Sequence, residues 1–233
     1  MALDISVPVL WSVLNPLLTA AVLYFVFSTL FKTSTENYIA FLYCGIVVWN
    51  CFVEAVNLGL EAVTGSASII NKVYVPKYIF PVSQVLSAMI NLLFALIPLF
   101  IICMITGVPV TKTYFLLPFG IGLLFMFSCG TSLIMATSNV FYRDTKFLWS
   151  VLSTMRMYLT PVFYTESIIP AAYISIYRMN PMYQILTFFR SILIQGVSPQ
   201  PLECLYALAA TVIPLLIGIW IFRSQQNKFV LYL

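Results

Sequence analysis

The chain has 233 residues, of which 11 are Lys or Arg, 7 are Asp or Glu and none is His. Hydrophobic residues make up 62% of the chain and charged residues 8%, whereas a soluble domain has roughly 25% charged residues. This composition excludes an ordinary water-soluble protein and predicts one that crosses a membrane several times.

The long apolar runs predict helices rather than strands, because they stay apolar on every side for the roughly 20 residues that a spanning helix needs. A membrane strand would instead alternate apolar and polar residues. The first run has no basic region before it and is too long for a signal peptide, so we expect it to remain as a span. We therefore expect an all-α membrane protein, with residues 1–233 as one domain. The six expected spans are 7–31, 38–62, 82–106, 114–140, 147–163 and 202–222.

The link between the second and third spans is basic and predicts a short helix at about 66–74. Such a helix would place Ile69, Ile70 and Val73 on one face, where they could insert into the groove of a partner protein. The alternative is a loop that its lysines hold to anionic membrane lipids. Both interpretations are open from the residues alone.

Lys and Arg residues are more frequent on one side of the expected topology, which predicts that this side and both termini face the cytoplasm. The net charge of +4 is therefore a topology signal and does not indicate nucleic-acid binding. The cytoplasmic set is Lys72, Lys77, Arg143, Lys146, Arg223 and Lys228, against Lys32, Lys112, Arg178 and Arg190 on the other side.

Arg143 and Asp144 lie in the short link at 141–146. They could pair with a partner protein or with the fifth span. Equally, they could be ordinary interfacial charges that contribute little energy.

The pattern changes after Pro161, where proline removes a helical hydrogen-bond donor. The following apolar pieces at 168–179 and 181–195 are too short to cross, so we expect two re-entrant or interfacial helices there. Asn180 and Pro181 form a good helix start, with Asn as the N-cap and Pro at the first helical position.

Two ionisable residues lie near the middle of expected spans, Glu54 in the second and Arg156 in the fifth. A charge at mid-bilayer costs about 2.5–3.5 kcal/mol on insertion scales, so each should face a cavity or a partner. They could line a transport path, pair with each other, or form a buried pair that only stabilises the fold.

Catalysis and metal binding find little support in the sequence. Histidine is absent, and the two aspartates, Asp4 and Asp144, form no pair that suits acid–base chemistry. The five cysteines have no metal-binding spacing and are expected to pack as small apolar residues. No glycine-rich phosphate loop occurs, so we expect no catalytic residue, no metal site and no cofactor bound by this chain.

Several stretches, in this order, resemble the permease subunits of type-2 ABC exporters for lipid-linked polysaccharides. They run from near Trp11 to the C-terminal part of the chain. The stretches are LNPLL at 14–18, GIVVWN at 45–50, IINKVYVPK at 69–77, NVFYRD at 139–144, TPVFY at 160–164, NP at 180–181 and FR at 189–190.

The resemblance implies roles for three groups of residues. Those expected to couple to an ATPase, as a helix that docks into it, are Ile69, Ile70, Asn71, Lys72, Val73 and Tyr74, with Arg143 and Asp144. Those expected to form a gate of two short helices are Pro161, Tyr164, Asn180, Pro181 and Arg190. Those expected to line a canal are Tyr24, Phe27, Glu54, Arg156, Tyr158 and Phe163, although packing remains an alternative for each aromatic ring.

The resemblance also implies a function and partners. The chain would form a homodimer in the bacterial inner membrane, with two copies of a cytoplasmic ATPase that carry ATP and Mg. The cargo would be a polyprenyl-linked glycan such as O-antigen, capsule or teichoic acid. The alternative is a drug, peptide or lipid moved by an exporter of the same type. The family usually begins with a basic amphipathic helix, whereas the ten residues before Trp11 contain no Lys or Arg, so an N-terminal ATPase contact stays open.

Overall fold

The computed structural model describes residues 14–26, 37–70, 72–73, 75–166, 170 and 173–232. These residues form helices and turns, and none of them lies in a β-strand. The prediction of an all-α fold is therefore confirmed for the described part of the chain.

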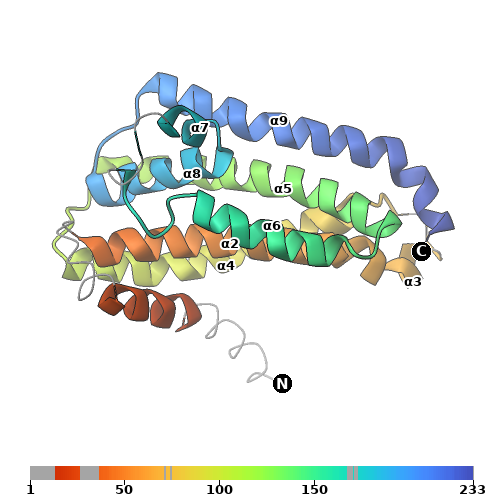
Figure 1. The fold of residues 1–233 in the computed structure, drawn as a ribbon, viewed down its shortest axis with the longest axis horizontal. Coiled ribbons are helices and arrows are strands. Elements are labelled where there is room, and N and C mark those ends of the chain that lie inside the picture. The colour runs from red at the N-terminus through yellow and green to blue at the C-terminus, as the bar shows by residue number, and fades with distance from the viewer. Residues whose placement is uncertain are drawn as a thin grey trace.

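Four helical segments are long and apolar enough to cross a bilayer, and they run side by side along the long axis of the molecule (Figure 1). They occupy the ranges expected for the second, third, fourth and sixth spans. They are α2 (Tyr38–Gly65), α4 (Ile79–Ile105), α5 (Leu117–Phe141) with the preceding 3-10 turn η1 (Lys112–Leu116), and α9 (Pro201–Gln225) with the following 3-10 turn η5 (Gln226–Leu231).

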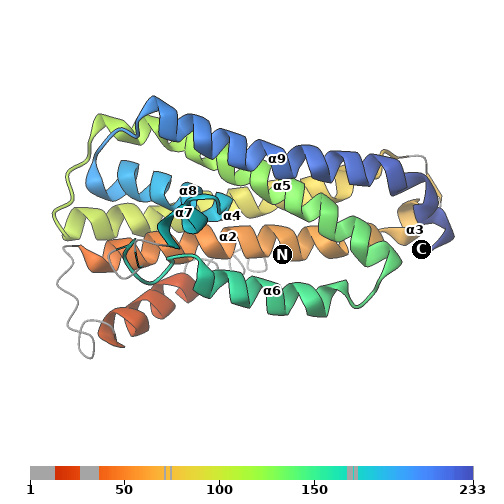
Figure 2. The same cartoon turned by 45° about the horizontal axis from the view of Figure 1, so that its top comes forward.

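The expected first and fifth spans are shorter in the described residues. The described part of the first is the helix Leu14–Val26. The fifth is α6 (Thr145–Leu159), whose 15 residues give about 22 Å of helix against a hydrocarbon core of about 30 Å. The two helices lie along the same side of the bundle, one beyond the other (Figure 2). Four helices that are long and apolar enough to cross are thus present in the described residues, and the count of six stays a prediction.

The short helices are α3 (Ala67–Ile70), α7 (Ile174–Arg178) and α8 (Pro181–Arg190). Helix α3 has four residues where the sequence suggested about 66–74. Helix α8 continues as a π-helical turn, η4 (Ser191–Gln195), and ends at Gly196, whose φ of 65° is the left-handed conformation that glycine favours. Residues 168, 169, 171 and 172 of the expected helix at 168–179 lie outside the described residues, and α7 is the helix that the structure describes in the rest of that range.

Helix α5 is central, because it packs against α2, α4 and α9. Glycines let α5 and α9 approach closely: a Cβ on Gly130 would lie 2.5 Å from the backbone nitrogen of Leu215, and one on Gly218 would lie 2.4 Å from the carbonyl oxygen of Gly130. Lipid offers no hydrophobic drive for helices to associate, so such close backbone packing holds membrane helices together.

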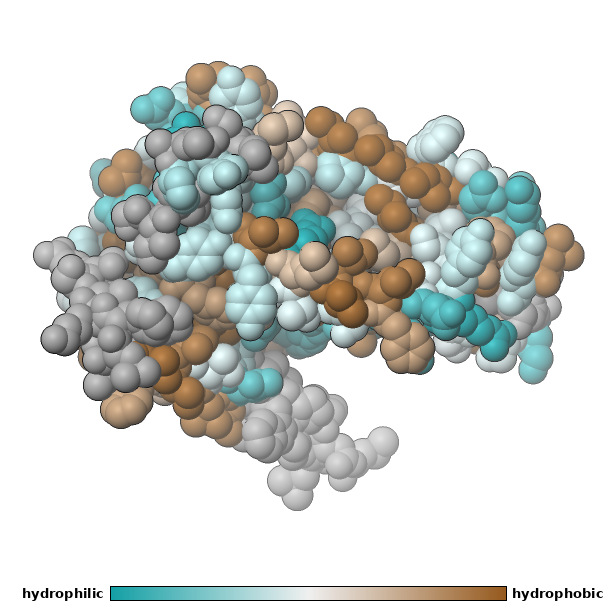
Figure 3. Space-filling view, viewed as in Figure 1, coloured by the Kyte–Doolittle hydropathy of each residue, from teal (hydrophilic) through white to brown (hydrophobic). Residues whose placement is uncertain are grey.

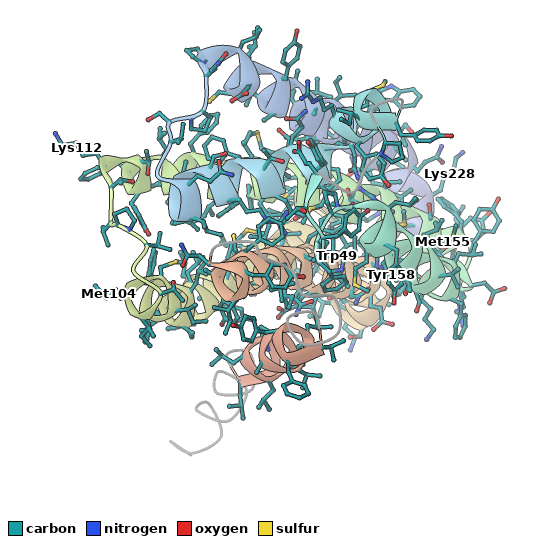
Figure 4. All side chains as sticks on the ribbon, turned by 60° about the vertical axis from the view of Figure 1, so that its left-hand side comes forward. Trp49, Met104, Lys112, Met155, Tyr158 and Lys228 are labelled. Carbon is teal, nitrogen blue, oxygen red and sulfur yellow. The ribbon has the colours of Figure 1, made fainter. Side chains whose placement is uncertain are left out.

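The two ends of the bundle differ in what they carry. One end, the α3 end, holds α3, the turn between α5 and α6, and the C-terminus (Figure 1). Lys228 lies toward this end, whereas Lys112 and Met104 lie at the opposite end (Figure 4). Between the ends, the surface over α9 is mainly hydrophobic (Figure 3), as expected for a face in contact with lipid.

Candidate functional site

The turn that follows α6, which we call the corner (residues 160–166), is joined to the start of α8. Asn180 is the N-cap of α8, and its Oδ1 accepts a hydrogen bond of 3.1 Å from the backbone N–H of Met182. Its Nδ2 donates to Oγ1 of Thr160 at 3.0 Å. The helix start predicted at Asn180 and Pro181 is therefore confirmed, and the same asparagine ties α8 to the corner.

Arg190, at the other end of α8, makes a second link to the corner. Its Nη1 and Nη2 donate to the carbonyl oxygens of Pro161 and Val162, both at 2.7 Å. Its guanidinium carbon lies 3.5 Å from the ring centroid of Phe41 on α2, a cation–π contact. Arg190 is buried, and a guanidinium keeps its charge in proteins. One buried cation thus joins α8, the corner and α2.

Space around this cation is tight because α2 carries a glycine here. A Cβ on Gly45 would lie 2.6 Å from the carbonyl oxygen of Val162 and 2.7 Å from Nη2 of Arg190. Neither Gly45 nor Phe41 was singled out from the sequence, although Gly45 opens one of the stretches that carried the resemblance.

Tyrosine hydroxyls complete the corner. Tyr38 donates to the carbonyl oxygen of Phe163 at 2.7 Å, and Tyr164 donates to that of Tyr158 in the last turn of α6 at 2.9 Å. Tyr183 on α8 donates to the Glu166 carboxylate.

The structure therefore brings the residues expected in the gate together around one turn. Pro161 and Arg190 are in direct contact, and Asn180, which precedes Pro181, bonds to the residue before Pro161. Tyr164 closes the end of α6 in the same turn.

At the α3 end, the residues expected to dock on a partner separate into two sets. Ile69 and Val73 are exposed, at 50% and 57%, and their backbones are joined by a hydrogen bond of 3.0 Å. Ile70 instead is buried in the bundle, so the three do not share one face. Lys72 is exposed, while Asn71 and Tyr74 lie outside the described residues.

Ile70 belongs to a second hydrophobic cluster, separate from the main core. The residues of this cluster come from five elements, α2, α3, α5, α9 and η5, and Phe229 of η5 is fully buried among them. Lys77 fixes the C-terminal segment further, because its Nζ donates to the carbonyl oxygen of Gln226 at 2.7 Å. The cluster consists of Val63, Ile70, Leu133, Ala136, Val140, Phe222 and Phe229.

Arg143 and Asp144 are exposed in the turn between α5 and α6. Arg143 and Lys146 line an open pocket of about 430 Å³ that also includes Glu61 and Tyr232. Asp144 stands at the N-cap position of α6 without a capping hydrogen bond from its side chain. Neither residue of the pair forms an ion pair within the described part of the chain, so both remain available to a partner.

The two ionisable residues within the spans do not pair with each other. Glu54 accepts a hydrogen bond of 2.7 Å from Nδ2 of Asn91 on α4. Arg156 instead lies over two rings of the core, with its guanidinium carbon 5.4 Å from the centroid of Phe52 and 5.3 Å from that of Phe127. The pairing of Glu54 with Arg156 that the sequence left open is therefore absent, and each charged group interacts with different residues.

The rings under Arg156 belong to an aromatic group that the sequence did not single out. Phe52 on α2 stacks on Phe127 of α5 at 4.9 Å and meets Trp149 of α6 edge-on at 6.0 Å. Trp149 also donates to Oδ1 of Asn57 at 2.8 Å. This group fixes α6 against the bundle.

The aromatic residues expected in a canal occupy different surroundings. Tyr24 and Tyr158 are exposed, at 40% and 64%, while Phe163 is partly buried against the main core. Phe27 lies outside the described residues. In the part of the chain that the structure describes, no group of three or more Cys, Asp or Glu side chains could hold a metal ion.

Residues 3–194 match the family described as ABC-2 type transporter. With most of its length matched, and with bilayer-length helices around a polar corner, the chain belongs to this family of membrane transport proteins. It is 27% identical to an O-antigen export system permease protein RfbA of Klebsiella pneumoniae, over 94% of this chain and 85% of that protein. It is 29% identical to the protein of the same description from Myxococcus xanthus, over the same shares of the two chains.

Proposed function

We propose that this chain is the permease subunit of an ATP-driven exporter that carries a lipid-linked polysaccharide of the O-antigen type across the bacterial inner membrane. The observation that carries the proposal is the similarity, over 94% of the chain, to permeases described as exporting O-antigen. Membership of the ABC-2 family and four bilayer-length helices agree with a transport role.

The proposed assembly is a homodimer with two copies of a cytoplasmic ATPase. The chain has no phosphate loop of its own, so ATP and Mg would be held by that partner. The exposed Ile69 and Val73, with Arg143 and Asp144 in the neighbouring turn, would provide the contact surface at the α3 end. The symmetric pairing of two permeases would then enclose the transport path.

Three finer features of topology belong to this proposal. The chain would have six spans, with the helix Leu14–Val26 in the first and α6 in the fifth. The helices α7 and α8 would re-enter the membrane on the outer side, and both termini would face the cytoplasm. The excess of Lys and Arg at the α3 end supports that orientation.

The corner with α8 is proposed as the gate at the outer end of the path. Its support is the network around Arg190, which joins α8 to α2 and to the end of α6. Movement of α6 or α2 would therefore be passed to α8. Tyr24, Phe27, Tyr158 and Phe163 would contact the passing sugars, alongside Glu54 and Arg156.

Deletion of the gene tests the proposal. We expect the surface polysaccharide to be lost, as measured by surface labelling. The lipid-linked polymer should collect on the cytoplasmic side of the inner membrane, where extraction of the cell lipids should recover it. Normal surface polymer in the deletion strain would refute the function. If the deletion strain kept normal surface polymer but no longer released a drug, peptide or lipid into the medium, the alternative cargo would be favoured.

A further inference from the structure

From Asn50 onward, α2 carries a row of polar side chains, with one exposed apolar residue, Leu58, at its edge, along a helix that is otherwise typical of a membrane span. Asn50, Asn57 and Glu61 are exposed and Glu54 is partly buried. These four residues, which we call the α2 track, are separated by four, three and four positions, so they share one face of the helix. With a rise of 1.5 Å per residue, the track extends over about 16 Å.

Other helices of the bundle expose apolar side chains over comparable lengths. Helix α4 exposes Leu93, Ile97 and Ile101, and α9 exposes Ile213 and Leu216. Those faces suit lipid. A carboxylate or amide that faces lipid is costly, so the α2 track is expected to face water or another polar surface.

Neighbouring helices hold two side chains of the track in place by hydrogen bonds. Each of these two side chains keeps a further hydrogen-bonding group that is not used. Asn91 of α4 binds one carboxylate oxygen of Glu54, and Trp149 of α6 binds the side-chain oxygen of Asn57. The second oxygen of Glu54 and the NH2 group of Asn57 have no partner among the described residues. The side chains of Asn50 and Glu61 likewise make no hydrogen bond within the described part of the chain.

The track opens at the α3 end into the pocket of about 430 Å³ described above. Glu61 is both the last residue of the track and part of the lining of that pocket. Glu61 therefore joins the pocket at the α3 end to the polar side chains that continue toward the middle of α2, which runs beside α6 (Figure 2).

We propose that the α2 track binds the hydroxyl groups of the polysaccharide as it passes along the permease. The inference rests on the proposed function. Sugar hydroxyls both donate and accept hydrogen bonds, so they match a row that offers amide donors beside amide and carboxylate acceptors. A second copy of this chain is a poorer match, because the exposed faces of its α4, α6 and α9 are mainly apolar.

Asn50→Leu gives the sharpest test, because Asn50 has no internal partner in the described structure and leucine is similar in size. In the complete transporter in cells, we expect export of surface polymer per unit of permease to fall about three- to tenfold, the effect of one lost hydrogen bond. The protein level should not fall, since leucine suits a membrane helix. Asn50→Gln, which keeps the amide, should restore most of the export.

A matched control is Tyr206→Leu on the exposed face of α9, which should leave export unchanged. Wild-type export by Asn50→Leu, with an equal or higher protein level, would mean that the track faces lipid and would overturn the inference. Loss of the dimer on size-exclusion chromatography would assign the track to contact between copies and would overturn it as well. If deletion of the whole gene leaves the surface polymer intact, the proposed function fails instead.

Discussion

Arg190 is a full charge placed where the chain is otherwise apolar, and it persists because the backbone nearby has free acceptors. Helix α6 ends at Leu159, with Thr160 as its C-cap, so the carbonyl groups of Pro161 and Val162 are not used in a helix. The guanidinium binds both of them, and the face of the Phe41 ring covers the remaining charge. A helix break that would expose unpaired backbone is therefore compensated by one side chain from elsewhere in the sequence.

Substitution of Arg190 should destabilise the protein strongly. Arg190→Met removes two charge-assisted hydrogen bonds, each of which contributes about 1.5–3 kcal/mol. Arg190→Lys keeps the charge but loses the planar pair of donors, so it should also lower stability. Thermal unfolding of the purified protein in detergent should show a lower Tm for both variants. Arg223→Lys, at an exposed arginine of α9, is the control and should match the wild type.

Whether the contacts of these residues could be predicted depended on how far apart the partners lie in the sequence. Asn180 as an N-cap was predictable, because the cap, Pro181 and the bonded N–H lie within three positions. The partners of Arg190 were not, since Pro161 lies 29 positions away and Phe41 comes from another helix. Such long-range contacts have no local pattern in the sequence.

At the scale of whole helices, apolar length was a good guide and the exact limits of short helices were not. The long helices follow from their apolar runs, and the proline inside α4 and the one inside α9 do not end them, because neighbouring helices support the membrane segment. Helix α6 is shorter than its apolar run because the chain turns at Thr160. In α3, burial of Ile70 depends on η5, which is more than 150 positions later and could not be inferred from 66–74.

Contact between α5 and α9 should depend on its two glycines. Gly130→Ala would place a Cβ against the backbone of Leu215, and Gly218→Ala would place one against Gly130, so the helices must move apart. Overpacking of this kind costs about 1–3 kcal/mol. Chemical unfolding in mixed detergent should show the loss for each variant.

Gly122, on the same helix α5, provides the matched control. A Cβ added there meets nothing within 4 Å, and alanine is the better helix former. Gly122→Ala should therefore be neutral or slightly stabilising. Equal losses for Gly122→Ala and Gly130→Ala would contradict close packing at Gly130 as the cause, because Gly122 has no such contact.

Phe229 should control the order of α3, because both reach the same cluster. Phe229→Ala removes a fully buried ring that packs near Ile70 and against Phe222. We expect faster amide hydrogen exchange in 63–70, since local opening becomes easier when a segment loses buried contacts. Leu231→Ala, at an 82% exposed residue of the same segment, is the control. Unchanged exchange in Phe229→Ala would mean that the C-terminal segment does not hold α3.

For the whole molecule, the separation of its two ends is the feature on which the transport proposal depends. The α3 end carries the exposed Ile69 and Val73, the charged turn after α5 and the pocket, whereas the opposite end carries the corner and α8. An exporter needs a surface that contacts its ATPase on one side of the membrane and a gate on the other side. The polar α2 track begins at the first end, and the Arg190 network lies near the second.

The orientation of these ends is open to a direct measurement. If the basic residues set the topology, Lys228 lies in the cytoplasm and Lys112 lies outside, since the excess of Lys and Arg stays on the cytoplasmic side. A membrane-impermeant maleimide should then label Lys112→Cys in intact spheroplasts and Lys228→Cys only after the membrane is opened. The background should carry Cys204→Ser, because Cys204 is the partly exposed one among the five cysteines and the other four are buried. Labelling of Lys228→Cys in intact spheroplasts would reverse the topology and remove α3 from the side where ATP is available.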